Sequence, residues 1–353
     1  MRPASYYRLQ ALFSTNTDKP DTQTFMELYK RATDEFRLGN LEACSDLSRK
    51  ALEEGHGNKA VNFRDMAAVH LNLSHTLKLM SNFPEALENA EMALKSLDAH
   101  FSSNKLEVCH ALDVVAELAC ELGDYKRARK CIDSAIEVKT RVAGASGLLL
   151  AKSYNIRGAI HLYQGSTAQA RSDFIRALGI NILHHGRGRP LPLSVGITMS
   201  NIAGVLKREA DRLPETIALY REVVKSFESA LSNSETSWMV GASLMDLAEV
   251  LLETNTQAGM DEAKDLLARS LHIFLMTRGP DHPSTARASE LFSKCGNMKP
   301  LHEPIGTSLD FVDNLLNECE KFIPKEPTRV SGDIVFLDKR GHVGQGHPHT
   351  PLF

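Results

Sequence analysis

Residues 111–136, ALDVVAELACELGDYKRARKCIDSAI, contain the pattern that decides the fold. Apolar side chains at 112, 115, 116 and 119 recur at the spacing of one helix face. Gly123 suits the end of that helix, because glycine adopts the left-handed backbone found there. Asp124 suits the N-cap of a second helix, one face of which carries Ala128, Ile132 and Ala135. The stretch therefore predicts a hairpin of two helices.

Small residues repeat along the chain at the same point of the second helix. The first series is Cys44, Ala86, Ala128, Ala170, Thr216 and Ala263, in steps of 42, 42, 42, 46 and 47 residues. A second series follows seven residues later, at Ala51, Ala93, Ala135, Ala177, Val223 and Ser270. A fixed period of this length predicts stacked hairpins that bury their apolar faces only against their neighbours. We expect hairpins at about 25–58, 65–100, 107–142, 149–184, 194–232 and 237–277, then a half unit ending near Cys295.

These repeats, together with the turn Gly279-Pro280-Asp281-His282-Pro283, resemble the tetratricopeptide repeat (TPR) family. Their length is similar to that of the long repeats of kinesin light chains. The resemblance implies an all-α fold, a right-handed α-solenoid of about six hairpins over residues 21–296. It also implies a non-enzymatic protein that binds other proteins.

The two ends of the chain differ from the repeats. Residues 1–20 begin with an acid-free stretch that contains Arg2 and Arg8, which is typical either of a mitochondrial transit peptide or of a disordered N-terminus. An amphipathic helix within 304–323 is expected to cap the last repeat. The tail 324–353 is rich in proline and glycine and is expected to be extended. Its one β-prone run can add to a partner's sheet or dock on the solenoid: Ile334, Val335, Phe336 and Leu337. The alternative is that the tail is disordered apart from these four residues.

Composition narrows the function further. The 353 residues carry a net charge of −3, which favours neither nucleic acid nor an anionic membrane. The six cysteines form no C-x-x-C pair and read as reduced, buried thiols. No apolar run is long enough to span a membrane, and phosphate-binding loops, nucleophile elbows and zinc helices are absent from the sequence. We therefore expect no catalytic residues, no metal, no cofactor, no nucleic acid and no small-molecule substrate.

The concave face, lined by the first helices, is the expected binding site. An amide can pair with the backbone of an extended peptide, so a ladder of asparagines there predicts peptide binding, or else hydrogen bonding between helices. Acidic side chains on the same face suit a basic partner, or are simply solvated. The residues expected at this groove are Asn72, Asn155, Asn201, Asp113, Glu117, Lys152, Arg208 and Glu249.

These observations predict an interaction scaffold, an accessory subunit or assembly factor of a larger mitochondrial complex. The alternative is a cytosolic adaptor that holds peptides in its groove, as its resemblance to kinesin light chain repeats implies.

Overall fold

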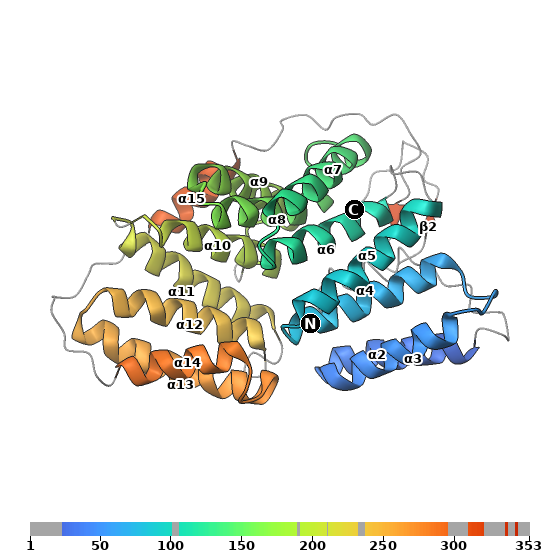
Figure 1. Cartoon of the computed structure of the whole chain (residues 1–353). Helices are drawn as coiled ribbons and strands as arrows, with labels where there is room; N and C mark the ends of the chain where they lie inside the picture. The colour runs from blue at the N-terminus through green and yellow to red at the C-terminus, as the bar shows by residue number, and fades with distance from the viewer. Residues whose placement is uncertain are drawn as a thin grey trace.

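The computed structural model describes residues 23–100, 106–188, 191–209, 211–231, 237–295, 310–320, 336–337 and 343–344. The described residues form helices packed in consecutive pairs, with one two-stranded hairpin near the C-terminus (Figure 1). This confirms the expected all-α solenoid. The helices are α2 (Gln23–Leu38), α3 (Leu41–Gly55), α4 (Phe63–Leu79), α5 (Phe83–His100), α6 (Leu106–Glu121), α7 (Tyr125–Ala143), α8 (Leu149–Tyr163), α9 (Thr167–His185), α10 (Leu193–Leu206), α11 (Leu213–Ala230), α12 (Trp238–Glu253), α13 (Gln257–Arg278), α14 (Pro283–Cys295) and α15 (Asp310–Glu320).

The turn inside each of the first four hairpins contains a residue with left-handed backbone. Gly39, Gly123 and Gly165 take this role with φ of 85°, 80° and 78°, which glycine adopts without a steric penalty. The second hairpin has Ser81 at the same position, with φ of 62°. In the third hairpin the side chain of Asp124 accepts a hydrogen bond from the Arg127 amide at 3.1 Å, and so caps α7 as the sequence predicts.

The small-residue positions are where paired helices touch. All twelve residues of the two series have no solvent-exposed surface, from Cys44 and Ala51 in α3 to Ala263 and Ser270 in α13. Helices can approach closely only where side chains are this small, and a larger one would overpack the contact. The sequence period is therefore the period of helix contacts.

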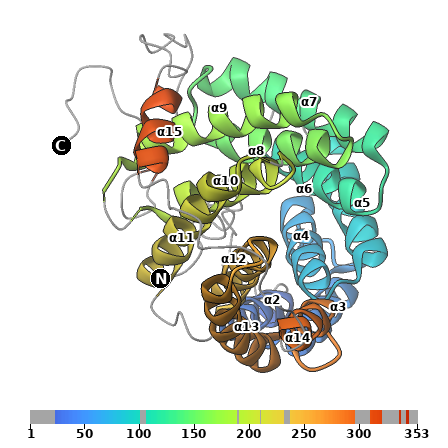
Figure 2. The same ribbon diagram turned by 90° about the vertical axis from the view of Figure 1, so that its left-hand side faces the viewer.

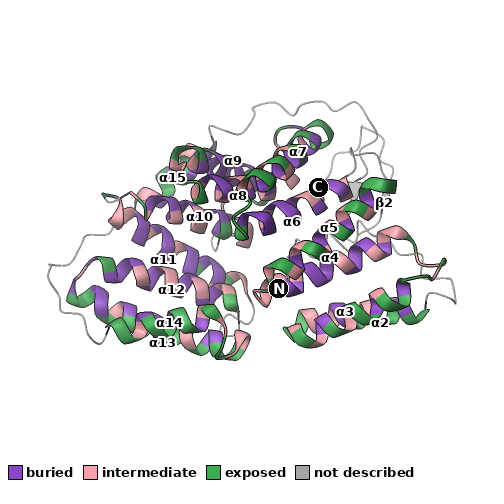
Figure 3. Ribbon diagram, viewed as in Figure 1, coloured by how far each residue is buried: buried purple, intermediate pink, exposed green. Residues whose placement is uncertain are grey.

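The hairpins wind about a common axis, with the first helix of each pair on the inside (Figure 2). Neighbouring first helices contact each other at α2 with α4, α4 with α6, α6 with α8, α8 with α10 and α12 with α14. Buried residues are dense in central helices such as α6 and sparse in α2 and α14 near the ends of the array (Figure 3). The inner face of α4, α6, α8, α10 and α12 is therefore a continuous surface on a packed frame.

The helix expected to cap the last repeat lies elsewhere. Helix α15 packs against α9 and α11, in the middle of the array, rather than on the terminal hairpin (Figure 2). Its buried side chains, among them Val312 and Leu315, join the core of the central hairpins. Arg187, in the loop after α9, donates to the Leu316 carbonyl at 2.6 Å and to Asn317 Oδ1 at 2.9 Å. The amphipathic pattern predicted the helix correctly and its docking surface wrongly.

Two residues of the β-prone run in the tail form a strand. Strand β1 (Phe336–Leu337) pairs antiparallel with β2 (Val343–Gly344), Phe336 opposite Gly344. Ile334 and Val335 lie outside the described residues, as do residues 1–22. The contact of this run with a partner stays a prediction.

Three first helices place a glycine against a phenylalanine of the second helix. A Cβ added at Gly158 of α8 would lie 2.5 Å from the ring of Phe174 in α9. The same added atom at Gly204 of α10 would meet nothing within 4 Å. Glycine is thus required by packing at the first position and only tolerated at the second.

Gly158→Ala is expected to lower the free energy of unfolding by about 1–3 kcal/mol, because the methyl group overpacks the contact with Phe174. The matched control Gly204→Ala should raise it, by up to about 1 kcal/mol, since alanine favours helix and the position is open. Urea unfolding followed by circular dichroism measures both. Equal stability of Gly158→Ala and the wild type would show that the two helices are not in this register.

Candidate functional site

The predicted groove residues occupy the first helices, but several are not accessible. Asn72 in α4 is 3% exposed and Asp113 in α6 is 1% exposed, so neither can reach a partner without rearrangement. Lys152, Asn155 and Asn201 are half-buried on α8 and α10. The others, Glu117, Arg208 and Glu249, keep part of their surface in solvent.

The asparagines at positions 155 and 201 bond to each other. Asn201 Nδ2 donates to Asn155 Oδ1 at 3.2 Å, and Asn155 Nδ2 donates to Thr198 Oγ1 at 2.9 Å. These contacts join α8 to α10 along the inner face. In the structure the two amides are braces between helices, the second of the two roles expected from the sequence, and their binding to a peptide stays a prediction.

The three acidic residues predicted for the groove, Asp113, Glu117 and Glu249, each form an ion pair within the chain. Asp113 is buried in an ion pair with Lys139 of α7 and also accepts from Ser153 Oγ at 2.8 Å. Glu117 pairs with Lys78 of α4. Glu249 binds Lys207 and Arg287, each at 2.7 Å. These carboxylates are neither free for a basic partner nor simply solvated, because stacking brings a cation of another helix to each one.

The cation Arg208 is also engaged. It follows α10, and its guanidinium donates to the Leu162 carbonyl at the end of α8. Its donor thus satisfies a carbonyl group at a helix C-terminus, where positive charge is favoured. It links the fourth hairpin to the fifth.

Three basic side chains on the inner face differ from these pairs. Lys152 of α8, His75 of α4 and His110 of α6 are half-buried, and within the described part of the chain Lys152 has no ion pair closer than 4 Å. His110 Nε2 is buried without a hydrogen-bond partner there, and its ring lies 6.2 Å from that of His75. We call His75, Lys78, His110, Glu117 and Lys152 the inner-face cluster.

Burial governs the charge state of this cluster. It lowers the pKa of His75 to about 3, with Lys152 and Lys78 acting in the same direction. It also lowers the pKa of His110 well below the usual value. Burial raises the pKa of Glu117, but the charges of Lys78 and Lys152 outweigh it and hold the pKa at about 2. At neutral pH both imidazoles are therefore uncharged. Burial also lowers the pKa of Lys152, which contacts no carboxylate in the described part of the chain.

The sequence held a signal for the histidines that we did not use. His75 and Glu117 are 42 residues apart, and so are His110 and Lys152. Stacking hairpins at this period brings equivalent positions of neighbouring first helices to one surface.

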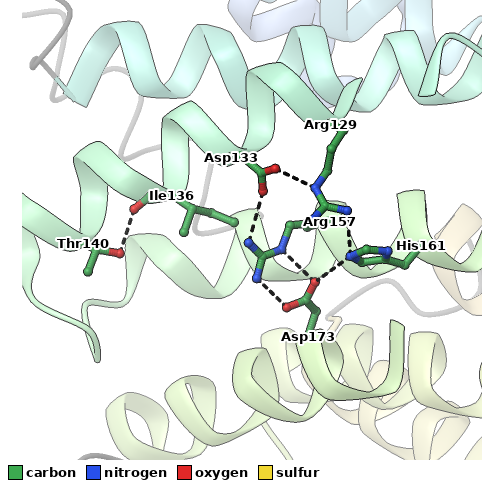
Figure 4. A network of polar contacts seen from close by, with 7 residues as sticks. All are labelled: Arg129, Asp133, Ile136, Thr140, Arg157, His161 and Asp173. Carbon is green, nitrogen blue, oxygen red and sulfur yellow. Dashed lines mark hydrogen bonds and ion pairs between the residues drawn. The ribbon is translucent and has the colours of Figure 1, made fainter. Parts of the chain in front are cut away.

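The frame behind α8 is fixed by a polar network (Figure 4). Arg157 of α8 donates to both carboxylate oxygens of Asp173 in α9, at 2.7 and 2.8 Å, and to Asp133 of α7 at 3.2 Å. Arg129 and His161 complete the network. A bidentate arginine–carboxylate pair is among the strongest polar contacts. The network connects α7, α8 and α9, which belong to adjacent hairpins. Its two arginines balance the charges of its two aspartates.

Acid is expected to destabilise the protein through His110. Unfolded histidine takes up a proton near pH 6.5, whereas His110 stays neutral when folded. Below that pH the unfolded state binds more protons, so stability falls as pH falls. The loss between pH 7 and 5.5, measured by urea unfolding, should be about 1 kcal/mol larger for the wild type than for His110→Gln.

The control for this prediction is His272→Gln, at an exposed position of α13. Its loss between the two pH values should match that of the wild type. Burial raises the pKa of Asp246 to about 6, which acts with the opposite sign but equally in all three proteins. An unchanged pH dependence in His110→Gln would mean that this imidazole is not shielded from water.

Among the described residues, no helix combines the length and apolar character needed to cross a bilayer. Nor do any three of their histidine, cysteine, aspartate or glutamate side chains gather as metal ligands would.

Residues 107–181, the third and fourth hairpins, match the family model described as tetratricopeptide repeat. No curated protein sequence matches the chain. Three solved structures share its fold. A Rap protein complexed with competence and sporulation factor is 13% identical, with a TM-score of 0.55, covering 86% of this chain and 78% of that one. The quorum sensor NprR from B. thuringiensis, in its apo form, is 16% identical, with a TM-score of 0.51 and coverage of 83% and 81%.

The third structure is a signal transduction ATPase with numerous domains from Pyrococcus horikoshii, which carries a tetratricopeptide repeat sensor. It is 14% identical, with a TM-score of 0.52, and the match covers 82% of this chain and 42% of that one. At these identities the likeness concerns the fold alone. The finer resemblance to kinesin light chain repeats stays a prediction.

Proposed function

We propose that this chain, a tetratricopeptide repeat protein, is a non-catalytic scaffold that binds an extended segment of a partner protein along its inner face. The observation that carries the proposal is Lys152 of α8, an amine that contacts no carboxylate in the described part of the chain and whose pKa is lowered by burial. The acids nearest to it are Asp113, bound to Lys139, and Glu117, bound to Lys78. Each of these two carboxylates therefore already contacts another cation.

An anionic side chain of a partner would fit there. A buried charge without a partner is costly, and an opposite charge that arrives with a ligand recovers part of that cost. The neutral imidazoles of His75 and His110 lie beside Lys152 and add donors that such a ligand can use. The rigid frame behind α8 keeps these groups in place before binding, which reduces the entropy lost on association.

A comparison supports the binding of a partner by this fold. The Rap protein with the same fold was solved in complex with competence and sporulation factor. By analogy of fold, the present superhelix is proposed to bind a partner as well.

A display selection of random dodecapeptides against the purified protein tests the proposal. Enriched peptides should carry Asp or Glu at a shared position. Lys152→Gln should weaken their binding by about tenfold to a hundredfold, the value of a hydrogen bond to a charged group. Lys130→Gln, at an exposed position on the outer helix α7, should leave it unchanged. Equal binding by both variants, or no enriched peptide, contradicts the proposal.

We further infer that the scaffold serves a mitochondrial multi-subunit complex, as an accessory subunit or assembly factor. The basic, acid-free N-terminal stretch with Arg2 and Arg8 supports this. A cytosolic peptide adaptor is the alternative, supported by the turn at 279–283 that resembles the kinesin light chain type.

Incubation of the radiolabelled chain with isolated mitochondria separates these two alternatives. The mitochondrial proposal expects a protease-protected product whose sequence begins near residues 14–20. A chain that stays outside, with Met1 intact, supports the cytosolic adaptor.

A further inference from the structure

The two ends of the superhelix meet through a small set of polar contacts. Arg278, the last residue of α13, donates to the Leu79 carbonyl at the end of α4, at 2.8 Å. His282 Nε2 lies 3.1 Å from Ser81 Oγ, in the turn between α4 and α5. About 200 residues separate these partners in the sequence. One turn of the superhelix is therefore closed by the α4–α5 turn against the α13–α14 turn (Figure 2).

Both sides of this contact are adapted to it. Ser81 holds φ of 62° at the position where the first, third and fourth hairpins have glycine. A left-handed backbone is unfavourable for serine, and here it presents the hydroxyl group to His282. On the other side, the guanidinium of Arg278 lies over the ring of Trp238, 4.6 Å from its centroid, and close to His282 Nε2, at 3.0 Å. The contacts with Trp238 and His282 thus orient the Arg278 side chain toward the Leu79 carbonyl.

The contact is polar and slight compared with the joints between neighbouring hairpins. Those joints bury apolar surface along whole helices, as between α11 and α12, and hold the array together by themselves. The closure joins only the ends of helices. A polar contact of this size contributes little against the hydrophobic core, so it can break and reform while every hairpin stays folded.

We propose that this contact is a latch: closed, it completes the superhelical turn around the inner face, and open, it lets a segment of the partner enter from the side. The identity of the entering segment rests on the proposed function, whereas the opening of the contact does not depend on it. A partner held by Lys152 would then be bound in the open array and retained when Arg278 and His282 engage the α4–α5 turn.

Distances between labels on the two sides test the latch. Bioorthogonal spin labels at Glu88 of α5 and Ala286 of α14, both exposed, avoid the native thiol of Cys295. The wild type should give one narrow distance distribution. In Arg278→Gln a second, longer population should grow about tenfold, as expected for the loss of a charged hydrogen bond. Arg269→Gln, which removes only the exposed pair with Glu228, is the matched control and should behave as the wild type.

Ser81→Gly is the second variant, because glycine keeps the turn and removes the hydroxyl group without a packing penalty. It should widen the distribution in the same direction. A single narrow distance in both variants, with helix content unchanged, overturns the latch.

The peptides selected against the wild type give the second readout. Their association rate with Arg278→Gln should be about tenfold higher, because the binding-competent open fraction is larger. An unchanged association rate, despite the longer distances, overturns the role of the contact in entry. The failure of the selection itself would count against the proposed function, and the distance distributions would still decide whether the latch opens.

Discussion

The close approach of two helices at residues without exposed surface is the constraint on which the whole molecule depends. At Ala86, Ala128 and Ala170 the second helix of a hairpin lies against its neighbours with no room for a larger side chain. Because the same contact recurs every 42 residues in the first hairpins, each unit adopts nearly the same angle to the one before. The inner face, its ladder of polar contacts and the meeting of the two ends all follow from the accumulation of that angle.

Salt bridges between hairpins help to fix the register of each hairpin against the next. Several salt bridges join residues about one repeat apart, and each is at least partly solvated, so each contributes little to stability. Their value lies in opposing a slip of one hairpin against the next, since a slip would place like charges together. The pairs are Arg49 with Glu85, Lys78 with Glu117, Arg127 with Glu91, Lys207 with Glu249, Arg221 with Glu262 and Arg269 with Glu228.

The repeat made the helices predictable, because an apolar period and a small-residue series are local signals. Interactions between units were harder to predict. Asp113 looked like a groove acid until Lys139 and Ser153 were seen to enclose it, and no one-dimensional pattern indicates which cation reaches it. The amphipathic stripe of α15 specified a helix with one apolar face, but many apolar surfaces fit such a stripe. The repeat spacing could have predicted that His75 and His110 lie on the inner face. Only the structure shows that burial keeps both imidazoles neutral.

The position of α15 also bears on how the chain folds as it is made. Repeat arrays can fold unit by unit, each hairpin adding to those already formed. Here the outer surface of α9 and α11 is covered by residues 310–320, which are synthesised more than 80 residues after α11 begins. The central hairpins therefore reach their final packing only after residues 310–320 have left the ribosome. Until then an apolar patch at the middle of the array faces solvent, a surface that chaperones recognise and that favours aggregation.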